Sequence, residues 1–133
     1  KPYTRKPFDI EDNTQYYTNN GVRMRSKSEV IIGNALEARN IPYLPEFPVL
    51  LTGYGYVFPD FYILNVRLRK VIIWEHHGLL DESDYRENNF LRKNELYLAN
   101  GYMPGDNLIQ TFESRKHPLG TKTINTIINK YLV

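Results

Sequence analysis

Two apolar runs that each lead to a carboxylate constrain this sequence most. Tyr56-Val57-Phe58 leads through Pro59 to Asp60, and Val71-Ile72-Ile73-Trp74 leads directly to Glu75. A polar, basic segment, residues 65–70, lies between the two runs. The pattern predicts neighbouring strands joined by a turn, each strand carrying one acidic residue. Because an unpaired buried charge is costly, two carboxylates on neighbouring strands indicate a shared cation.

Apolar periodicity and turn residues predict the remaining elements. Helical spacing predicts a first helix from Ser26 to about residue 40. Residues 43–51 predict a strand, and its two prolines indicate an edge position or a bulge. Strands are also predicted at 56–64, 68–74 and 107–112, with helices from about 84 to 100 and after Gly120. The expected fold class is α/β, with a mixed four-stranded sheet flanked by helices. Residues 1–24 are irregular and are expected to form an N-terminal arm or a linker, which leaves 25–133 as the folded domain.

Composition narrows the class of protein. A chain of 133 residues with 41% hydrophobic residues is enough for one domain with its own core. The absence of cysteine excludes disulfides and thiolate metal sites. No apolar run approaches the roughly 20 residues that span a bilayer, and no signal peptide is visible, so a cytoplasmic protein is expected. The first residue is Lys1 rather than Met, which indicates a piece of a longer chain. A homodimer is left open.

The two acidic motifs resemble the signature of the PD-(D/E)XK nuclease superfamily. Pro59-Asp60 is similar to its first half and Glu75-His76-His77 to its second, and the resemblance covers roughly residues 25–113. It is closest to a bacterial branch whose strand ends Trp-Glu-His and is followed by a glycine. The resemblance implies a restriction-endonuclease-like αβββαβ core and a divalent-metal-dependent endonuclease or exonuclease that hydrolyses phosphodiester bonds. DNA is the expected substrate, and RNA is left open.

The resemblance also implies the metal ligands. Asp60 and Glu75 would hold Mg²⁺ or Mn²⁺, which prefer hard oxygen ligands. Glu29, on the first helix, is the third candidate, because a glutamate there joins the metal or its water shell in several branches. An alternative for Glu29 is purely structural, since Ser26-x-x-Glu29 is a capping box. A dedicated zinc site is not expected, because adjacent histidines on a strand point to opposite faces.

One departure concerns the catalytic lysine of the superfamily, whose place on the strand is taken by His77. Strand alternation puts His77 on the same side as Glu75 and His76 on the other side. Lys93, on the following helix, is the second candidate for the lysine's role, with Tyr97 one turn later as a supporting residue. His77, Lys93 and His76 remain open alternatives.

Basic and aromatic residues indicate how a nucleic acid would bind. Arg25, Lys27, Arg67 and Arg69 are the candidate phosphate contacts, the last two ranked lower because their turn lies at the far end of the strands. Three tyrosines can stack on bases, although ordinary packing is the simpler expectation for each: Tyr54, Tyr56 and Tyr102. The missing strand lysine also favours an alternative function, a non-catalytic nucleic-acid-binding domain that keeps the nuclease fold.

Overall fold

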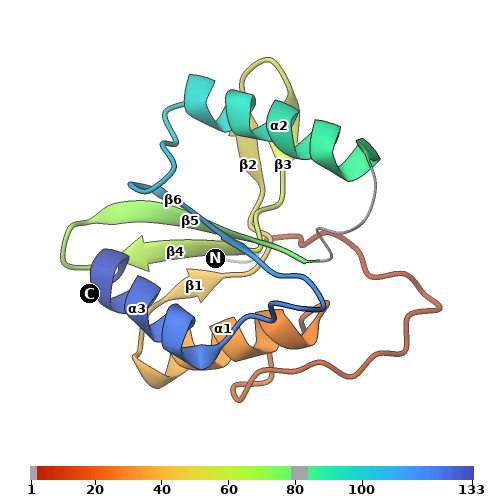
Figure 1. Ribbon diagram of the computed structural model, residues 1–133, viewed down its shortest axis with the longest axis vertical. Helices are drawn as coiled ribbons and strands as arrows, with labels where there is room; N and C mark the ends of the chain where they lie inside the picture. The colour runs from red at the N-terminus through yellow and green to blue at the C-terminus, as the bar shows by residue number, and fades with distance from the viewer. Residues whose placement is uncertain (1–2, 79–83) are drawn as a thin grey trace.

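The chain folds into a central sheet with a layer of secondary structure on each face (Figure 1). The computed structural model describes residues 3–78 and 84–133, the side chains of 84–89 excepted. The elements in chain order are α1 (Lys27–Ala38), β1 (Tyr43–Leu44), β2 (Val49–Leu51), β3 (Gly55–Val57), β4 (Phe61–Asn65), β5 (Lys70–His77), α2 (Asp84–Ala99), β6 (Leu108–Phe112) and α3 (Thr121–Tyr131).

The main sheet is mixed and has the strand order β1-β4-β5-β6. The pairs β1–β4 and β4–β5 are antiparallel, whereas β5 and β6 run parallel, with α2 as the crossover between them. Strands β2 and β3 form a separate antiparallel hairpin. The expected α/β class with a mixed four-stranded sheet is therefore confirmed.

The two faces of the sheet bury two different clusters of side chains. Helices α1 and α3 cover one face, where Ile32 and Ile128 pack with Phe61 and Trp74. Helix α2 and the β2–β3 hairpin cover the other face, where Tyr97 packs with a set from both sheets: Val49, Leu51, Val57, Ile73 and Leu108. Because β5 is covered on both faces, its centre reads as a continuous apolar run rather than an alternation.

Two of the expected strands are wrong, because each one divides. The strand expected over 43–51 breaks after Leu44, since Glu46 adopts a left-handed backbone with φ of 54° that an extended ladder cannot contain. The strand expected over 56–64 breaks at residues 58–60, where Pro59 lacks the N–H that a ladder needs. In both cases the first part and the second part belong to different sheets.

The segment before α1 lies against the body of the protein. The Tyr3 hydroxyl donates to the Pro45 carbonyl at 2.8 Å, and the Tyr3 ring meets Phe47 edge-on. The backbone of Met24 donates to the Tyr16 carbonyl, and the Met24 side chain joins the buried cluster under α1. Among the described helices, none combines the length and the apolar character that crossing a membrane requires.

Candidate active site

Asp60 and Glu75 face each other across the β4–β5 pair. The last paired residues at this end are Phe61 and Trp74, so one further step of the same register places Asp60 opposite Glu75. Side chains of directly opposed residues lie on the same face of a sheet, with Cβ atoms about 5 Å apart. The backbone N–H of His76 donates to Asp60 Oδ2 at 2.8 Å, which fixes the orientation of that carboxylate.

Two side chains of α2 reach the other carboxylate. The Tyr97 hydroxyl donates to Glu75 Oε2 at 2.6 Å, and Lys93 Nζ lies 3.1 Å from the same oxygen. Lys93 and Tyr97 are four residues apart, so they lie on one face of the helix. Burial and the negative charge of Glu75 raise the pKa of Tyr97, so that this hydroxyl stays protonated and keeps donating. Glu75 is thus held by a cation and a hydroxyl from a single helix.

Glu29 contributes a third carboxylate from the first turn of α1. Ser26 is the N-cap, since its hydroxyl accepts the Glu29 N–H at 3.2 Å, while Glu29 Oε1 accepts the N–H of Arg25 at 3.0 Å. Glu29 can therefore take part in capping α1 while its carboxylate also lies near the sheet. Burial raises the pKa of Glu29, and the charge of Glu29 in turn helps to raise that of Asp60.

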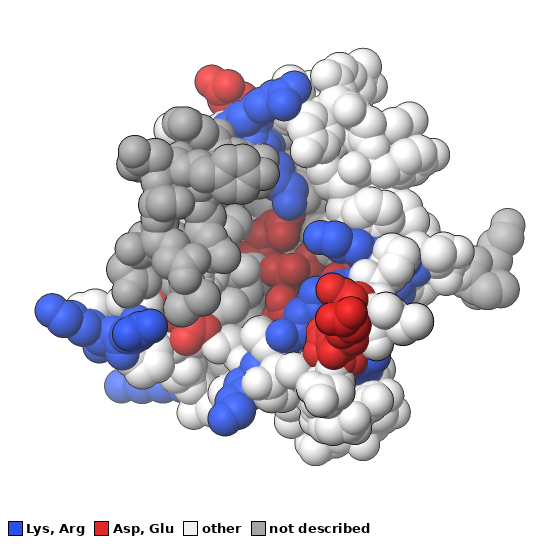
Figure 2. Space-filling model, turned by 90° about the vertical axis from the view of Figure 1, so that its right-hand side faces the viewer, with Lys and Arg blue, Asp and Glu red and all other residues white. Residues whose placement is uncertain are grey.

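The site carries more negative charge than its protein partners offset. Burial raises the pKa of Asp60 well above its usual value, and the charges of Glu75 and Glu29 raise it further. Figure 2 shows acidic side chains set back in a hollow on this side of the molecule, with basic side chains beside them. Like charges at such close range need a cation between them or a proton on one of them.

The carboxylate donors fit an oxygen-preferring divalent ion such as Mg²⁺ or Mn²⁺ better than a dedicated zinc site. Among the side chains that the structure describes, which exclude those of residues 84–89, no three from His, Cys, Asp or Glu are grouped closely enough to hold a metal ion on their own. Mg²⁺ does not need three, because it commonly takes one or two carboxylates and keeps several waters. Asp60 and Glu75 would supply these carboxylates, and Glu29 would act through a bound water.

The two histidines lie on opposite faces of the sheet. The His77 ring shares the face of Glu75 but stacks on Phe112, meets Phe90 edge-on, and pairs with Gln110 at 3.1 Å. Burial lowers the pKa of His77, which favours the neutral ring. Of the open alternatives for the lysine's role, Lys93 is the one that contacts a carboxylate of the site, whereas His77 is held in an aromatic cluster.

His76 is anchored under the opposite face. Its Nδ1 pairs with Thr111 Oγ1 at 2.8 Å, and its Nε2 pairs with Glu113 Oε1 at 2.5 Å. The Trp74 indole also donates to Thr111 Oγ1, at 3.0 Å. These contacts hold the strand backbone that donates to Asp60. No role was predicted for Thr111 and Glu113, although their place at the carboxyl end of a strand parallel to β5 was a usable signal.

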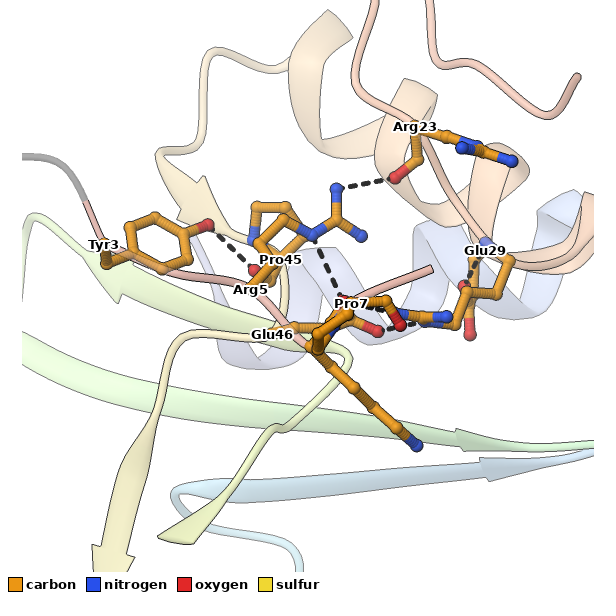
Figure 3. Close-up of polar contacts among 9 residues, drawn as sticks. Tyr3, Arg5, Pro7, Arg23, Glu29, Pro45 and Glu46 are labelled. Carbon is orange, nitrogen blue, oxygen red and sulfur yellow. Dashed lines mark hydrogen bonds and ion pairs between the residues drawn. The ribbon is translucent and has the colours of Figure 1, made fainter. Parts of the chain in front are cut away.

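Arg25 is occupied by the fold. Its guanidinium contacts both carboxylate oxygens of Glu46 and donates to the carbonyl of Lys6. Arg5 Nε donates to Glu46 Oε1 at 3.1 Å. Figure 3 shows Arg5 between Arg23 and Glu46, with its guanidinium bonded to the Arg23 carbonyl and to the Glu46 carboxylate. No local sequence pattern around Glu46 predicts that it pairs with Arg5 and Arg25. Because the Arg25 backbone binds Glu29, the arm that fixes Arg25 also borders the site.

The other candidate phosphate contacts lie at two ends of the molecule. Lys27 is exposed at the first residue of α1, two residues from Glu29. Arg67 and Arg69 lie in the β4–β5 turn, where Arg67 contacts the carbonyl of Val133 at 3.4 Å. Lys27 is therefore near the carboxylates, whereas the turn lies at the opposite end of the strands.

The chain is thus an α/β protein with a buried group of carboxylates at one end of its sheet. Comparison with known proteins finds one similar protein. No family model and no solved structure matches the chain. The chain is 35% identical over 91 residues to an uncharacterized protein of Methanocaldococcus jannaschii, MJ1519. The match covers 68% of this chain and 8% of that much longer protein, so it leaves function to be argued from the site.

Proposed function

We propose that the protein is a Mg²⁺- or Mn²⁺-dependent nuclease of the PD-(D/E)XK type that hydrolyses phosphodiester bonds in DNA. The observation that carries the proposal is the grouping at Glu75, which faces Asp60 across the strands and contacts Lys93 and Tyr97 from α2. This grouping brings together two carboxylates suited to a divalent metal ion, a cation and a hydroxyl at one end of the sheet. The superfamily resemblance of the motifs supports the same function.

The residues divide the work of hydrolysis among them. A bound Mg²⁺ or Mn²⁺ would acidify a water molecule and offset the charge of the phosphate. Asp60 and Glu75 would bind that ion, and Glu29 would orient its water shell. The Lys93 ammonium would hold the attacking water and offset the charge that builds up on the phosphate oxygens. Tyr97 keeps Glu75 oriented, and the His76 N–H does the same for Asp60.

The test is incubation with supercoiled, linear and single-stranded DNA in Mg²⁺, Mn²⁺ or EDTA. We expect cleavage with either metal and none with EDTA. Asp60→Asn and Glu75→Gln should each lower the rate by at least about a hundredfold, as loss of one preorganised group does in other enzymes. The control is Glu95→Gln, which changes an exposed glutamate of the same helix as Lys93.

Two results would contradict the proposal. Cleavage that survives both Asp60→Asn and Glu75→Gln would remove the carboxylates from the reaction. DNA binding without cleavage under every metal condition would instead identify a non-catalytic binding domain.

A further inference from the structure

The β2–β3 hairpin turns an uncharged, aromatic face to solvent. Leu50 and Tyr56 are cross-strand partners in this hairpin and are each 61% exposed. Tyr54, in the turn, is 44% exposed. Residues 47–58 contain no charged side chain, and the alternate hairpin residues are buried against α2. The hairpin therefore uses one face for the core and leaves the other free.

One cation of α2 contacts the turn of this hairpin. The Arg92 guanidinium is 5.2 Å from the centre of the Tyr54 ring, within the range of a cation–π contact. Arg92 is itself exposed and directly precedes Lys93, which contacts Glu75. Tyr54 is thus in contact with a positive charge on the helix that serves the site.

The hairpin also leads directly into the acidic site. Strand β3 ends at Val57, and the chain reaches Asp60 three residues later. Tyr56 and Asp60 are four residues apart, so their Cα atoms are separated by at most about 14 Å. A polymer that lies on the hairpin would therefore be within a few units of its own length of the carboxylates.

Tyr102 shows what a packed tyrosine looks like in the same region. Its ring meets the Tyr97 ring edge-on with centres 5.8 Å apart, and it lies against the core cluster under α2. Burial raises the pKa of Tyr102. Tyr54 and Tyr56 differ from it, because their rings have no such place in the core.

We propose that Leu50, Tyr54, Tyr56 and Arg92, the hairpin face, bind unpaired bases of a nucleic-acid strand beside the carboxylate site. The inference rests on the proposed nuclease function and names its substrate class, a nucleic acid with a single-stranded segment. Aromatic rings bind any base by stacking, and an arginine strengthens the contact while it attracts the strand's phosphates. Bases of an intact duplex are already stacked on one another and do not offer their faces.

The experiment measures binding of a fluorescent single-stranded oligonucleotide and of its duplex, both in the Asp60→Asn background with Mg²⁺ present. In this background the proposed cleavage is blocked, so binding is measured alone. Tyr54→Ala and Tyr56→Ala should each weaken single-strand binding about 5-fold to 150-fold, which is the usual loss of one base–aromatic stack. Duplex binding should change little, and Tyr56→Trp should restore the single-strand affinity.

The matched control is Tyr17→Ala, which removes a tyrosine of similar exposure, 47%, from the segment before α1. It should leave both affinities unchanged. Because the tyrosines of the hairpin face are exposed, the thermal unfolding of each variant should match that of its parent, which separates lost contacts from lost folding.

Three results would overturn the inference. Unchanged single-strand binding in both tyrosine variants would show that the hairpin face does not bind the strand. An equal loss of affinity for duplex would show that the face does not prefer unpaired bases. A parent dimer that becomes a monomer in Tyr56→Ala would assign the face to a second copy of the chain. The two proposals fail separately, since absent cleavage by the unmodified protein contradicts the nuclease, whereas tyrosine-independent binding contradicts only the hairpin face.

Discussion

The contact between Lys93 and Glu75 favours Lys93 over His77 as the cation of the proposed nuclease site. Lys93→Ala should lower the single-turnover cleavage rate by about 10²–10³-fold, because a preorganised positive charge beside the phosphate is lost. His77→Ala should instead lower the free energy of unfolding by about 1 kcal/mol or more, because the ring packs on Phe90 and Phe112. Single-turnover rates and urea unfolding measure the two effects.

Lys122→Ala is the control for Lys93, since it removes an exposed lysine of α3. The assignment would fail if His77→Ala abolished cleavage while Lys93→Ala kept the parent rate.

The raised pKa of Asp60 makes a prediction about stability and pH. Burial and the charges of Glu75 and Glu29 raise the folded-state pKa above the ordinary value of 3.8. The folded protein then binds this proton more tightly than the unfolded chain does. The contribution of Asp60 to stability is therefore fully present below pH 3.8 and is lost as pH rises through the folded-state pKa. In EDTA at pH 8, Asp60→Asn should therefore melt at a higher temperature than the parent protein.

Melting curves between pH 4 and pH 8 check this expectation. The difference should shrink toward pH 4, and Mg²⁺ should raise the melting temperature of the parent protein more than that of the variant. A parent protein that is the more stable of the two at pH 8 in EDTA would contradict it.

At the scale of elements, the Arg5 side chain anchors the segment before α1 to the rest of the fold. Its guanidinium donates to Glu46 and to the Arg23 carbonyl. Arg5→Ala should lower the free energy of unfolding by about 2 kcal/mol, since charge-assisted hydrogen bonds contribute about 1.5–3 kcal/mol each. Lys6→Ala, which removes an exposed neighbouring side chain, should change it by less than about 0.5 kcal/mol. Urea unfolding of both variants tests this, and equal stabilities would contradict it.

Local sequence patterns were sufficient to predict the elements that are specified by their own apolar periodicity. The apolar run of β5 and the helical spacing of α1 and α3 predicted these elements, because burial on a sheet face or helix stripe follows directly from periodicity. The break at Glu46 was missed, because the residues that hold its carboxylate, Arg5 and Arg25, lie 41 and 21 positions away. No local pattern carries such a contact.

The candidate site divides in the same way. Asp60 and Glu75 could be placed together from strand pattern alone, since a short turn joins their strands. The anchoring of His76 by Thr111 and Glu113 depends on the parallel pairing of β5 with β6 across a helix, which periodicity does not specify. The sequence therefore predicted the carboxylates better than the residues that support them.

At the scale of the whole molecule, the candidate phosphate contacts Lys27, Arg67 and Arg69 are divided between the two ends of the sheet. Arg69 directly precedes β5 and lies six positions before Glu75, which at about 3.4 Å per strand residue is about 20 Å. This exceeds the screening length of about 8 Å at physiological salt. Arg67→Glu with Arg69→Glu should therefore leave DNA affinity unchanged, whereas Lys27→Ala should weaken it.

Salt titration of DNA binding separates these cases. Loss of one phosphate contact should reduce the log–log slope by about 0.9 on duplex DNA, and Lys27→Ala is expected to show this reduction. An unchanged slope in Lys27→Ala together with a reduced slope in the double arginine variant would place the DNA at the other end of the sheet.

The shortness of β1 has a consequence for how copies of the protein meet. Only Tyr43 and Leu44 pair at this border of the sheet, between Pro42 and Pro45. Proline has no N–H to offer, and an incoming strand needs a continuous row of donors and acceptors. Strand addition along β1 is therefore blocked, which protects this border from aggregation and directs any homodimer to another surface.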